Sequence, residues 1–189
     1  MISKHRAKHI IIVDDSKLSI SAFLEELALT GFKVSHYRSV DSCLEFVKTK
    51  RHVDIFVLDI MMPPGNAYRS RNTDDGLFTG RLLAHDIRRL YPITPIVFLS
   101  NLSDPINIDG FSRSRELLGN VVFLNKVDVS PVHFSKLINS ILSKGIDAVE
   151  NKSLFAKIID SLLIRPSFYG IGIDLLKLFK MKKRKDDSN

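Results

Sequence analysis

Hydrophobic and polar positions divide the first 143 residues into short apolar runs separated by longer amphipathic stretches. Runs of about four to eight residues are typical of strands, and continuously apolar runs are typical of strands buried on both faces, as in a parallel sheet. The pattern therefore predicts five strands, over His9–Val13, Lys33–Tyr37, Val53–Leu58, Ile93–Leu99 and Val121–Leu124.

The amphipathic stretches predict helices, because their apolar residues recur at the spacing of one helix face. Gly31 follows the first stretch and can close a helix in the left-handed conformation, and Ser39 and Ser130 stand where N-caps are expected. Strands that alternate with helices indicate an α/β fold, a doubly wound parallel sheet with helices on both faces. The five predicted helices are Lys17–Thr30, Asp41–Lys50, Leu77–Leu90, Pro105–Leu118 and Pro131–Ser143.

Three segments depart from this alternation. Residues 60–76, after the third predicted strand, contain two prolines, two glycines and a polar run, and a loop of this length in a compact domain is usually functional or mobile. Residues 144–152 are rich in small and polar types and predict a linker. Residues 153–189 carry two apolar stripes at helical spacing, so we expect a small helical C-terminal extension after a main domain over residues 1–143.

The composition is that of a soluble globular protein, with 44% hydrophobic and 26% charged residues. The single cysteine, Cys43, cannot close an internal disulfide, which fits a reducing compartment. The apolar run near the start, Ile10–Val13, is too short for a signal peptide or a membrane span. We therefore expect a cytoplasmic protein.

The net charge of +7 is concentrated toward the C-terminus. Residues 1–143 carry 18 basic and 15 acidic residues, a net charge of +3, whereas residues 144–189 carry 10 and 6, a net charge of +4. The basic run Lys182–Lys185 is either a solvated helix end or a binding patch. The tail shows no helix-turn-helix or winged-helix pattern, so the sequence disfavours DNA binding.

Polar and charged residues follow four of the predicted strands. Asp14 and Asp15 follow the first strand, Asp59 the third, Ser100 the fourth and Lys126 the fifth. Ligands of open parallel sheets bind beyond the carboxyl ends of the strands, so we expect these groups to share one edge. Clustered carboxylates repel one another unless a cation lies between them, and hard oxygen ligands suit magnesium (Mg2+). With that ion bound, one carboxylate can attack a phosphoryl group, so the residues predict a site that forms and holds an aspartyl phosphate.

Four motifs resemble, in order and spacing, the receiver domain of bacterial two-component response regulators over about residues 8–143. They are IIIVDDS, VLDIMMPP, IVFLSN and VVFLNK. The resemblance implies a flavodoxin-like sheet with strand order 2-1-3-4-5 and a role in phosphorelay signal transduction. It also implies a sensor histidine kinase or phosphotransfer protein as phosphodonor, and output through another protein.

The resemblance also assigns roles within the site. Asp59 corresponds to the phospho-accepting aspartate of a phosphoprotein, which is also a metal ligand. Asp14 and Asp15 correspond to the acidic pair that binds magnesium, with Asp15 the more direct ligand. The backbone carbonyl of Met61 completes the protein's share of the coordination.

Three further residues correspond to the parts that respond to phosphorylation. Lys126 resembles the lysine that pairs with the phosphate, and Ser100 resembles the switch hydroxyl that turns toward it. Phe123 falls where receivers keep an aromatic whose inward or outward rotamer reports phosphorylation, although a lone aromatic at such a position is commonly a core residue. The added charge would bias Ser100 and Phe123 between two arrangements.

Three features depart from the receiver pattern. Receivers usually have a cis proline after the lysine, but Val127 follows Lys126 here, which predicts a trans bond. The run Gly65–Asp75 is inserted before the helix-starting glycine, and Asn101 replaces the usual small residue after the switch hydroxyl.

Other interpretations remain open from the sequence. Taken singly, Asp59 could be a helix cap, Lys126 a surface lysine and Ser100 a turn residue. A haloacid-dehalogenase-like phosphatase also forms an aspartyl phosphate, but it needs a second aspartate where Met61 stands. A pseudo-receiver, which binds partners without phosphorylation, is the other alternative.

The role of the extension is likewise open. It could pack on the receiver, form a homodimer, dock an output partner, or make weak contact with an acidic membrane surface through its basic amphipathic end.

Overall fold

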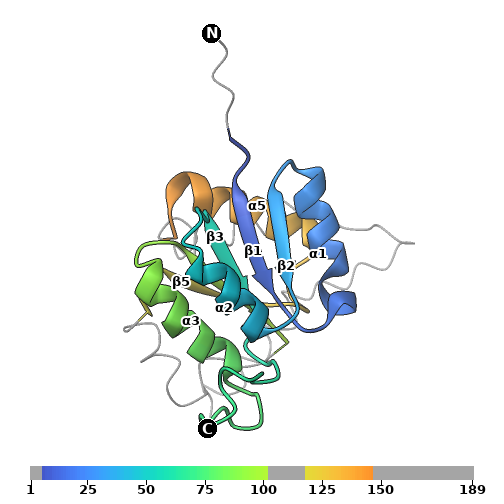
Figure 1. Ribbon diagram of the computed structural model, residues 1–189. Coiled ribbons are helices and arrows are strands. Elements are labelled where there is room, and N and C mark those ends of the chain that lie inside the picture. Colours follow the sequence, from blue (N-terminus) through green and yellow to red (C-terminus); the bar gives the residue numbers. More distant parts are fainter. Residues whose placement is uncertain (1–5, 102–117, 147–189) are drawn as a thin grey trace, which may run out of the picture.

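The computed structural model describes residues 6–101 and 118–146, which form a parallel sheet between two layers of helices (Figure 1). The strands lie in the order β2-β1-β3-β4-β5, and every neighbouring pair is parallel. This is the flavodoxin-like order that the resemblance implies. The strands are β1 (His9–Val13), β2 (Lys33–Tyr37), β3 (Ile55–Leu58), β4 (Ile96–Ser100) and β5 (Val121–Asn125).

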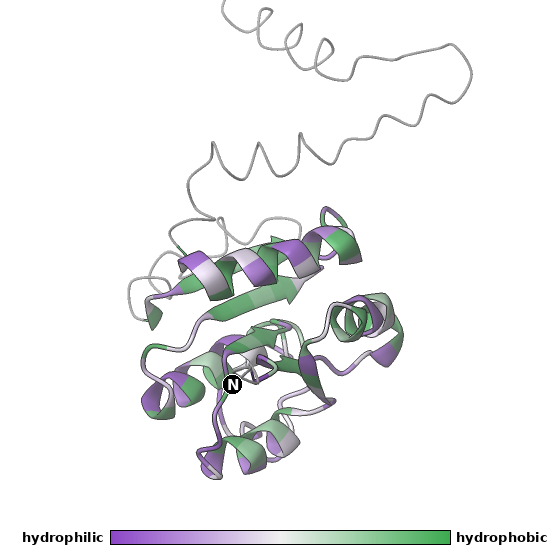
Figure 2. Cartoon of the chain, turned by 90° about the horizontal axis from the view of Figure 1, so that it is seen from above, coloured by the Kyte–Doolittle hydropathy of each residue, from purple (hydrophilic) through white to green (hydrophobic). Residues whose placement is uncertain are grey.

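Helices cover both faces of the sheet. The helices in the described ranges are α1 (Lys17–Leu29), α2 (Val40–Lys48), α3 (Thr79–Leu90) and α5 (Pro131–Lys144). Helices α1 and α5 pack together on one face and α2 and α3 on the other, and Figure 2 shows the largely hydrophobic strands between them. Within these ranges no helix combines the length and the apolar character that a membrane crossing requires. The predicted helix 105–118, the linker 144–152 and the extension 153–189 lie almost wholly outside the described residues.

The predicted helix ends are confirmed at three positions. The Ser39 and Ser130 side chains accept hydrogen bonds from the backbone N–H groups three residues later, as N-caps do. Gly31 has φ +86°, a left-handed conformation that closes α1 at no steric cost. A third N-cap, Ser16, does the same for α1 and was not predicted.

The fourth strand starts three residues later than predicted, at Ile96. The Arg88 guanidinium donates hydrogen bonds to the carbonyls of Tyr91, Pro92 and Thr94, and these carbonyls are therefore engaged in a loop and do not pair with a neighbouring strand. The third predicted helix also starts later, at Thr79, because the preceding residues form turns that bond back to the carbonyls of residues 73 and 74.

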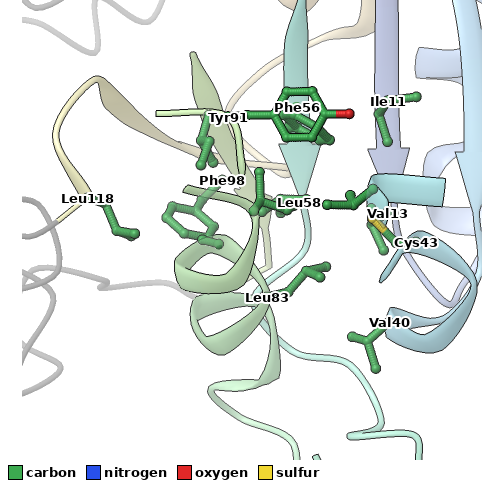
Figure 3. Packing of buried hydrophobic residues seen from close by; sticks show 14 of the residues in the cluster. Ile11, Val13, Val40, Cys43, Phe56, Leu58, Leu83, Tyr91, Phe98 and Leu118 are labelled. Atoms are coloured by element: carbon green, nitrogen blue, oxygen red, sulfur yellow. The ribbon is translucent and has the colours of Figure 1, made fainter. Parts of the chain in front are cut away.

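Alternate residues of each central strand pack into two separate cores. Ile11, Val13, Phe56 and Phe98 pack toward α2 and α3, where Figure 3 shows them with Leu83. Residues of the opposite parity on β1, β3 and β4 pack toward α1 and α5. Because both faces are buried, the strands are apolar throughout, and polar groups are displaced to the strand ends.

The inserted loop between β3 and α3 is attached to both helices of its face. Asp41 at the start of α2 accepts hydrogen bonds of 2.8 Å from the backbone N–H groups of Asn66 and Ala67. The Tyr68 hydroxyl donates to Asp86 of α3 at 2.8 Å, and the tyrosine is 2% exposed. The loop therefore contributes a core residue in addition to its polar surface.

Candidate functional site

The carboxyl ends of four strands bring the predicted polar residues together at one edge of the sheet. Asp14 and Asp15 follow β1, Asp59 follows β3, Ser100 ends β4, and Lys126 follows β5. One oxygen from each of the three carboxylates lies within 4.8 Å of the other two. In Figure 1 this is the lower edge, toward which the arrow of β1 points.

Lys126 lies between two of these carboxylates. Its Nζ is 2.6 Å from Asp59 Oδ2 and 2.6 Å from Asp14 Oδ2, and its side chain is 5% exposed. Burial alone lowers the pKa of a lysine, but the favourable interactions with the two carboxylates outweigh it and raise the pKa of Lys126 above its ordinary value. Lys126 is therefore an ammonium ion at neutral pH.

The other oxygen of Asp59 accepts two hydrogen bonds. The Ser100 hydroxyl donates to Asp59 Oδ1 at 2.6 Å, and the Met61 backbone N–H donates to the same oxygen at 3.1 Å. Ser100 is fully buried, and its own carbonyl accepts from the Lys126 backbone N–H at 2.9 Å. Asp59 is thus held by groups from three segments of the chain. Met61 contacts it through its backbone N–H. The role of the Met61 carbonyl as a metal ligand stays a prediction.

Asp14 has one oxygen that suits a cation. Its Oδ1 accepts from the Ser16 backbone N–H at 2.9 Å and from the Ser19 hydroxyl at 3.3 Å. Its Oδ2 is buried and forms an ion pair with Lys126, and no other described residue donates a hydrogen bond to it. Three carboxylates and one ammonium have a formal charge of −2 together, which a divalent cation would neutralise. The residues therefore fit Mg2+, which prefers carboxylate oxygens and retains several waters.

Two residues that position the site were not predicted. The Gly80 backbone N–H donates to the Ile60 carbonyl at 2.9 Å. A Cβ on Gly80 would lie 1.9 Å from the Asp59 carbonyl oxygen, so only glycine lets α3 approach the end of β3 this closely. The His36 ring donates through Nε2 to the Asp14 carbonyl at 2.9 Å, which ties the end of β2 to the turn after β1. A lone glycine within a helical pattern is a signal that could have indicated Gly80, whereas no local sequence pattern marks His36.

Known structures match this arrangement of strands and helices. A CheY-like response regulator receiver domain from Methanospirillum hungatei JF-1 is 17% identical, with a TM-score of 0.59 and coverage of 75% of this chain and 98% of that domain. Chemotaxis protein CheY4 of Vibrio cholerae is 19% identical, with a TM-score of 0.56 and coverage of 72% and 99%. The receiver domain of Francisella response regulator 1452 is 20% identical, with a TM-score of 0.55 and coverage of 72% and 98%. The chain has the receiver fold. No protein-family model and no curated protein matches the sequence.

Two of the three departures from the receiver pattern, Val127 and Asn101, directly follow site residues. The described residues contain no cis peptide bond, so the bond between Lys126 and Val127 is trans, as predicted. The Val127 side chain is exposed, and Asn101 is exposed after the buried Ser100. Phe123 of β5 is partly buried and packs against the core on the α2 and α3 side, and its role as a switch stays a prediction.

Proposed function

We propose that this protein is a response-regulator receiver that accepts a phosphoryl group on Asp59, with Mg2+, from a histidine kinase, a phosphotransfer protein or a small phosphodonor. The observation that carries the proposal is the position of Asp59, whose two oxygens contact a buried ammonium and a buried hydroxyl beside two further carboxylates. A single capping aspartate or a surface lysine needs none of these partners.

The chemistry follows from the groups around Asp59. A carboxylate oxygen of Asp59 attacks the phosphorus of the donor, a P–O bond forms, and the bond to the leaving group breaks with its electron pair. Lys126, already within 2.6 Å of Asp59, can then pair with a phosphoryl oxygen, and Ser100 can donate its hydroxyl to another. Asp14, Asp15, Asp59 and the Met61 carbonyl would hold Mg2+, which would neutralise charge on the phosphoryl oxygens.

Signalling would come from the rearrangement of these contacts. The Ser100 hydroxyl donates to Asp59 at 2.6 Å in this structure, and a phosphoryl oxygen would compete for that donor. Ser100 of β4 pairs with Asn125 of β5, and Phe123 lies two residues before Asn125 on the same strand. Movement of Ser100 would free space for Phe123. We propose that output is by protein–protein interaction, in the cytoplasm, with the extension available for homodimer formation or partner docking.

The same geometry disfavours a phosphatase that turns over added esters. In that chemistry a second carboxylic acid two residues after the nucleophile moves protons, and Met61 stands there with a thioether side chain that cannot do so. We therefore propose a signal transducer and not an enzyme that acts on external substrates. A pseudo-receiver would require none of the contacts that Asp59 makes.

Intact mass after incubation with Mg2+ and acetyl phosphate tests the proposal. We expect one phosphoryl adduct on the full chain. The adduct should not form when EDTA is present from the start, and it should be absent from Asp59→Asn. Asp75→Asn, which makes the same change at an exposed position of the inserted loop, is the matched control and should keep the adduct. Continuous hydrolysis of added phosphate esters would instead support the phosphatase, and no metal-dependent adduct in the wild type would support the pseudo-receiver.

A further inference from the structure

A pocket lies along β2, the edge strand of the sheet. It has a volume of about 420 Å³ and extends along β2 from Lys33 to Tyr37, beside the amino end of β1, the α2 residue Phe46 and the segment before β3. The residues lining it are Arg6, Ala7, His9, Lys33, Ser35, Tyr37, Phe46, Arg51 and His52. Tyr37 accepts a backbone hydrogen bond from Asp14, but none of the side chains that line the pocket takes part in the site around Asp59.

The pocket is strongly positive. Arg6, Lys33 and Arg51 line it, and among the described residues that line it there is no carboxylate. The nearby Asp54 is the counterion of Arg6 and also contacts Lys8 and His52, so its single charge is shared among several basic groups. Within residues 6–101 and 118–146, Lys33 and Arg51 have no carboxylate at ion-pair distance. The excess charge therefore favours an anionic ligand.

The aromatic wall of the pocket, formed by Tyr37, Phe46 and His9, can accept a planar group. The rings of Tyr37 and Phe46 lie 5.4 Å apart at an interplanar angle of 37°, and the His9 ring meets Phe46 edge-on at 6.0 Å. These three rings come from β2, α2 and β1, so the backbone of three elements fixes their positions. Aromatic walls of this kind bind flat rings by stacking or edge contact.

The pocket also holds an oriented polar group. The His9 Nδ1 lies 3.2 Å from the His52 carbonyl, which can only accept, so Nδ1 carries the proton and Nε2 is the acceptor. Nε2 lies 2.9 Å from the Ser35 hydroxyl, which must therefore donate its hydrogen to the ring. His9 is 7% exposed, and burial together with the nearby Lys33 lowers its pKa, which keeps this neutral tautomer at pH 7. The Ser35 oxygen is left as a hydrogen-bond acceptor for an N–H group.

We propose that this pocket binds a small nucleotide, with the phosphate at Lys33 and Arg51 and the base against Tyr37 and Phe46. The observation is the juxtaposition of unpaired basic side chains, an aromatic wall and a fixed acceptor around one cavity. A ligand that carries both a phosphate and a flat nitrogenous ring can contact the basic side chains, the aromatic rings and the Ser35 oxygen. Inorganic phosphate can contact only the basic side chains. The site is separate from Asp59, so this proposal does not depend on phosphorylation.

Titration of the full chain with AMP, GMP, adenosine and inorganic phosphate tests the assignment, without Mg2+ or a phosphodonor. Calorimetry gives the affinities, and amide chemical shifts in NMR spectra locate the binding. We expect saturable binding of AMP or GMP at least about tenfold tighter than binding of adenosine or phosphate alone, because each half supplies separate contacts. The shifts should centre on Ser35, Phe46 and His52.

A pair of charge-matched double variants gives the control. Lys33→Ala with Arg51→Ala removes the two basic groups of the pocket, and we expect nucleotide affinity to fall by about tenfold or more, since each removes a charged contact. Lys48→Ala with Arg89→Ala removes the same charge from the groove between α2 and α3 and should leave the affinity unchanged.

Four results would overturn the proposal. The first three are the absence of saturable nucleotide binding to the wild type, equal affinity for inorganic phosphate and AMP, and equal losses in the two double variants. Because the amide shifts are measured on the wild type, shifts confined to residues around Asp59 would also refute it, even where a variant fails to fold.

Discussion

Replacing Gly80 with alanine tests how closely α3 must approach Asp59. In an open helix this change stabilises a protein by about 1 kcal/mol, because glycine loses more backbone freedom on folding. Here the added Cβ would lie 1.9 Å from the Asp59 carbonyl oxygen and 2.8 Å from the Asp59 carbonyl carbon and Ile60 Cα. Real Cβ atoms do not approach backbone atoms within 3.0 Å, so α3 and the segment after β3 must separate by about 1 Å.

The cost of that separation exceeds the gain in helix propensity. Forcing an extra carbon into a packed contact costs about 1–3 kcal/mol. The hydrogen bond of 2.9 Å from the Gly80 N–H to the Ile60 carbonyl would also lengthen, at a cost of about 1 kcal/mol. Set against the gain of about 1 kcal/mol, the free energy of unfolding should fall by about 1–3 kcal/mol.

Urea unfolding measures the loss, and Gly31→Ala is the matched control. Gly31 has φ +86°, and no atom of the described residues lies within 4 Å of an added Cβ, so its substitution costs only the left-handed strain of about 1–2 kcal/mol. Both variants lose stability, but only Gly80→Ala should shift the NMR amide signals of Asp59 and Met61. A Gly80→Ala protein as stable as the wild type, or with those two signals unmoved, would refute the reasoning.

Three other substitutions test separate parts of the structure. Lys126→Met leaves two buried carboxylates without their ammonium, so we expect the free energy of unfolding in EDTA to fall by about 3–5 kcal/mol. Adding Mg2+ should then raise the Tm of the variant more than that of the wild type. Equal Tm values for the two proteins in EDTA would contradict this. Tyr68→Phe removes the hydrogen bond to Asp86 and should cost about 1–2 kcal/mol in urea unfolding, whereas an unchanged midpoint would mean that the loop is not held there. Burial alone raises the pKa of Asp54, but donors from His9, His52 and Lys8 outweigh it and hold this pKa below its ordinary value. The stability from Asp54 is therefore complete above its unfolded pKa of about 3.9 and is lost as the pH falls through the lower folded value, so Asp54→Asn should lower Tm at pH 7 and flatten the decline of Tm below pH 4.

The sheet and the grouping of site residues were predictable because each rests on a strong physical constraint. Strands such as β1 and β3 are buried on both faces, so their apolar runs stand out from the amphipathic helices around them. Parallel strands end at one edge, so Asp14, Asp59 and Lys126 had to meet there once the strands were identified.

The remaining details depend on contacts between distant residues. Arg88 binds three loop carbonyls and so delays the start of β4, which no pattern around Ile93 indicates. Tyr68 lies in a mostly polar run of the sequence, yet it is buried, because its ring packs into the core on the α2 and α3 side and its hydroxyl reaches Asp86 of α3. The distances that define the site, such as 2.6 Å from Ser100 to Asp59, likewise depend on how β3 and β4 pair and on the close approach of Gly80.

The resident ammonium of Lys126 has a consequence for how the resting protein depends on its surroundings. Because Lys126 contacts Asp14 and Asp59 at 2.6 Å each, the carboxylates have an internal counterion whether or not a divalent ion is at hand. Under the proposed function, the protein in a cell depleted of free magnesium would stay folded but could not be phosphorylated until the ion returned. Magnesium supply would then control phosphorylation without deciding whether the chain is folded.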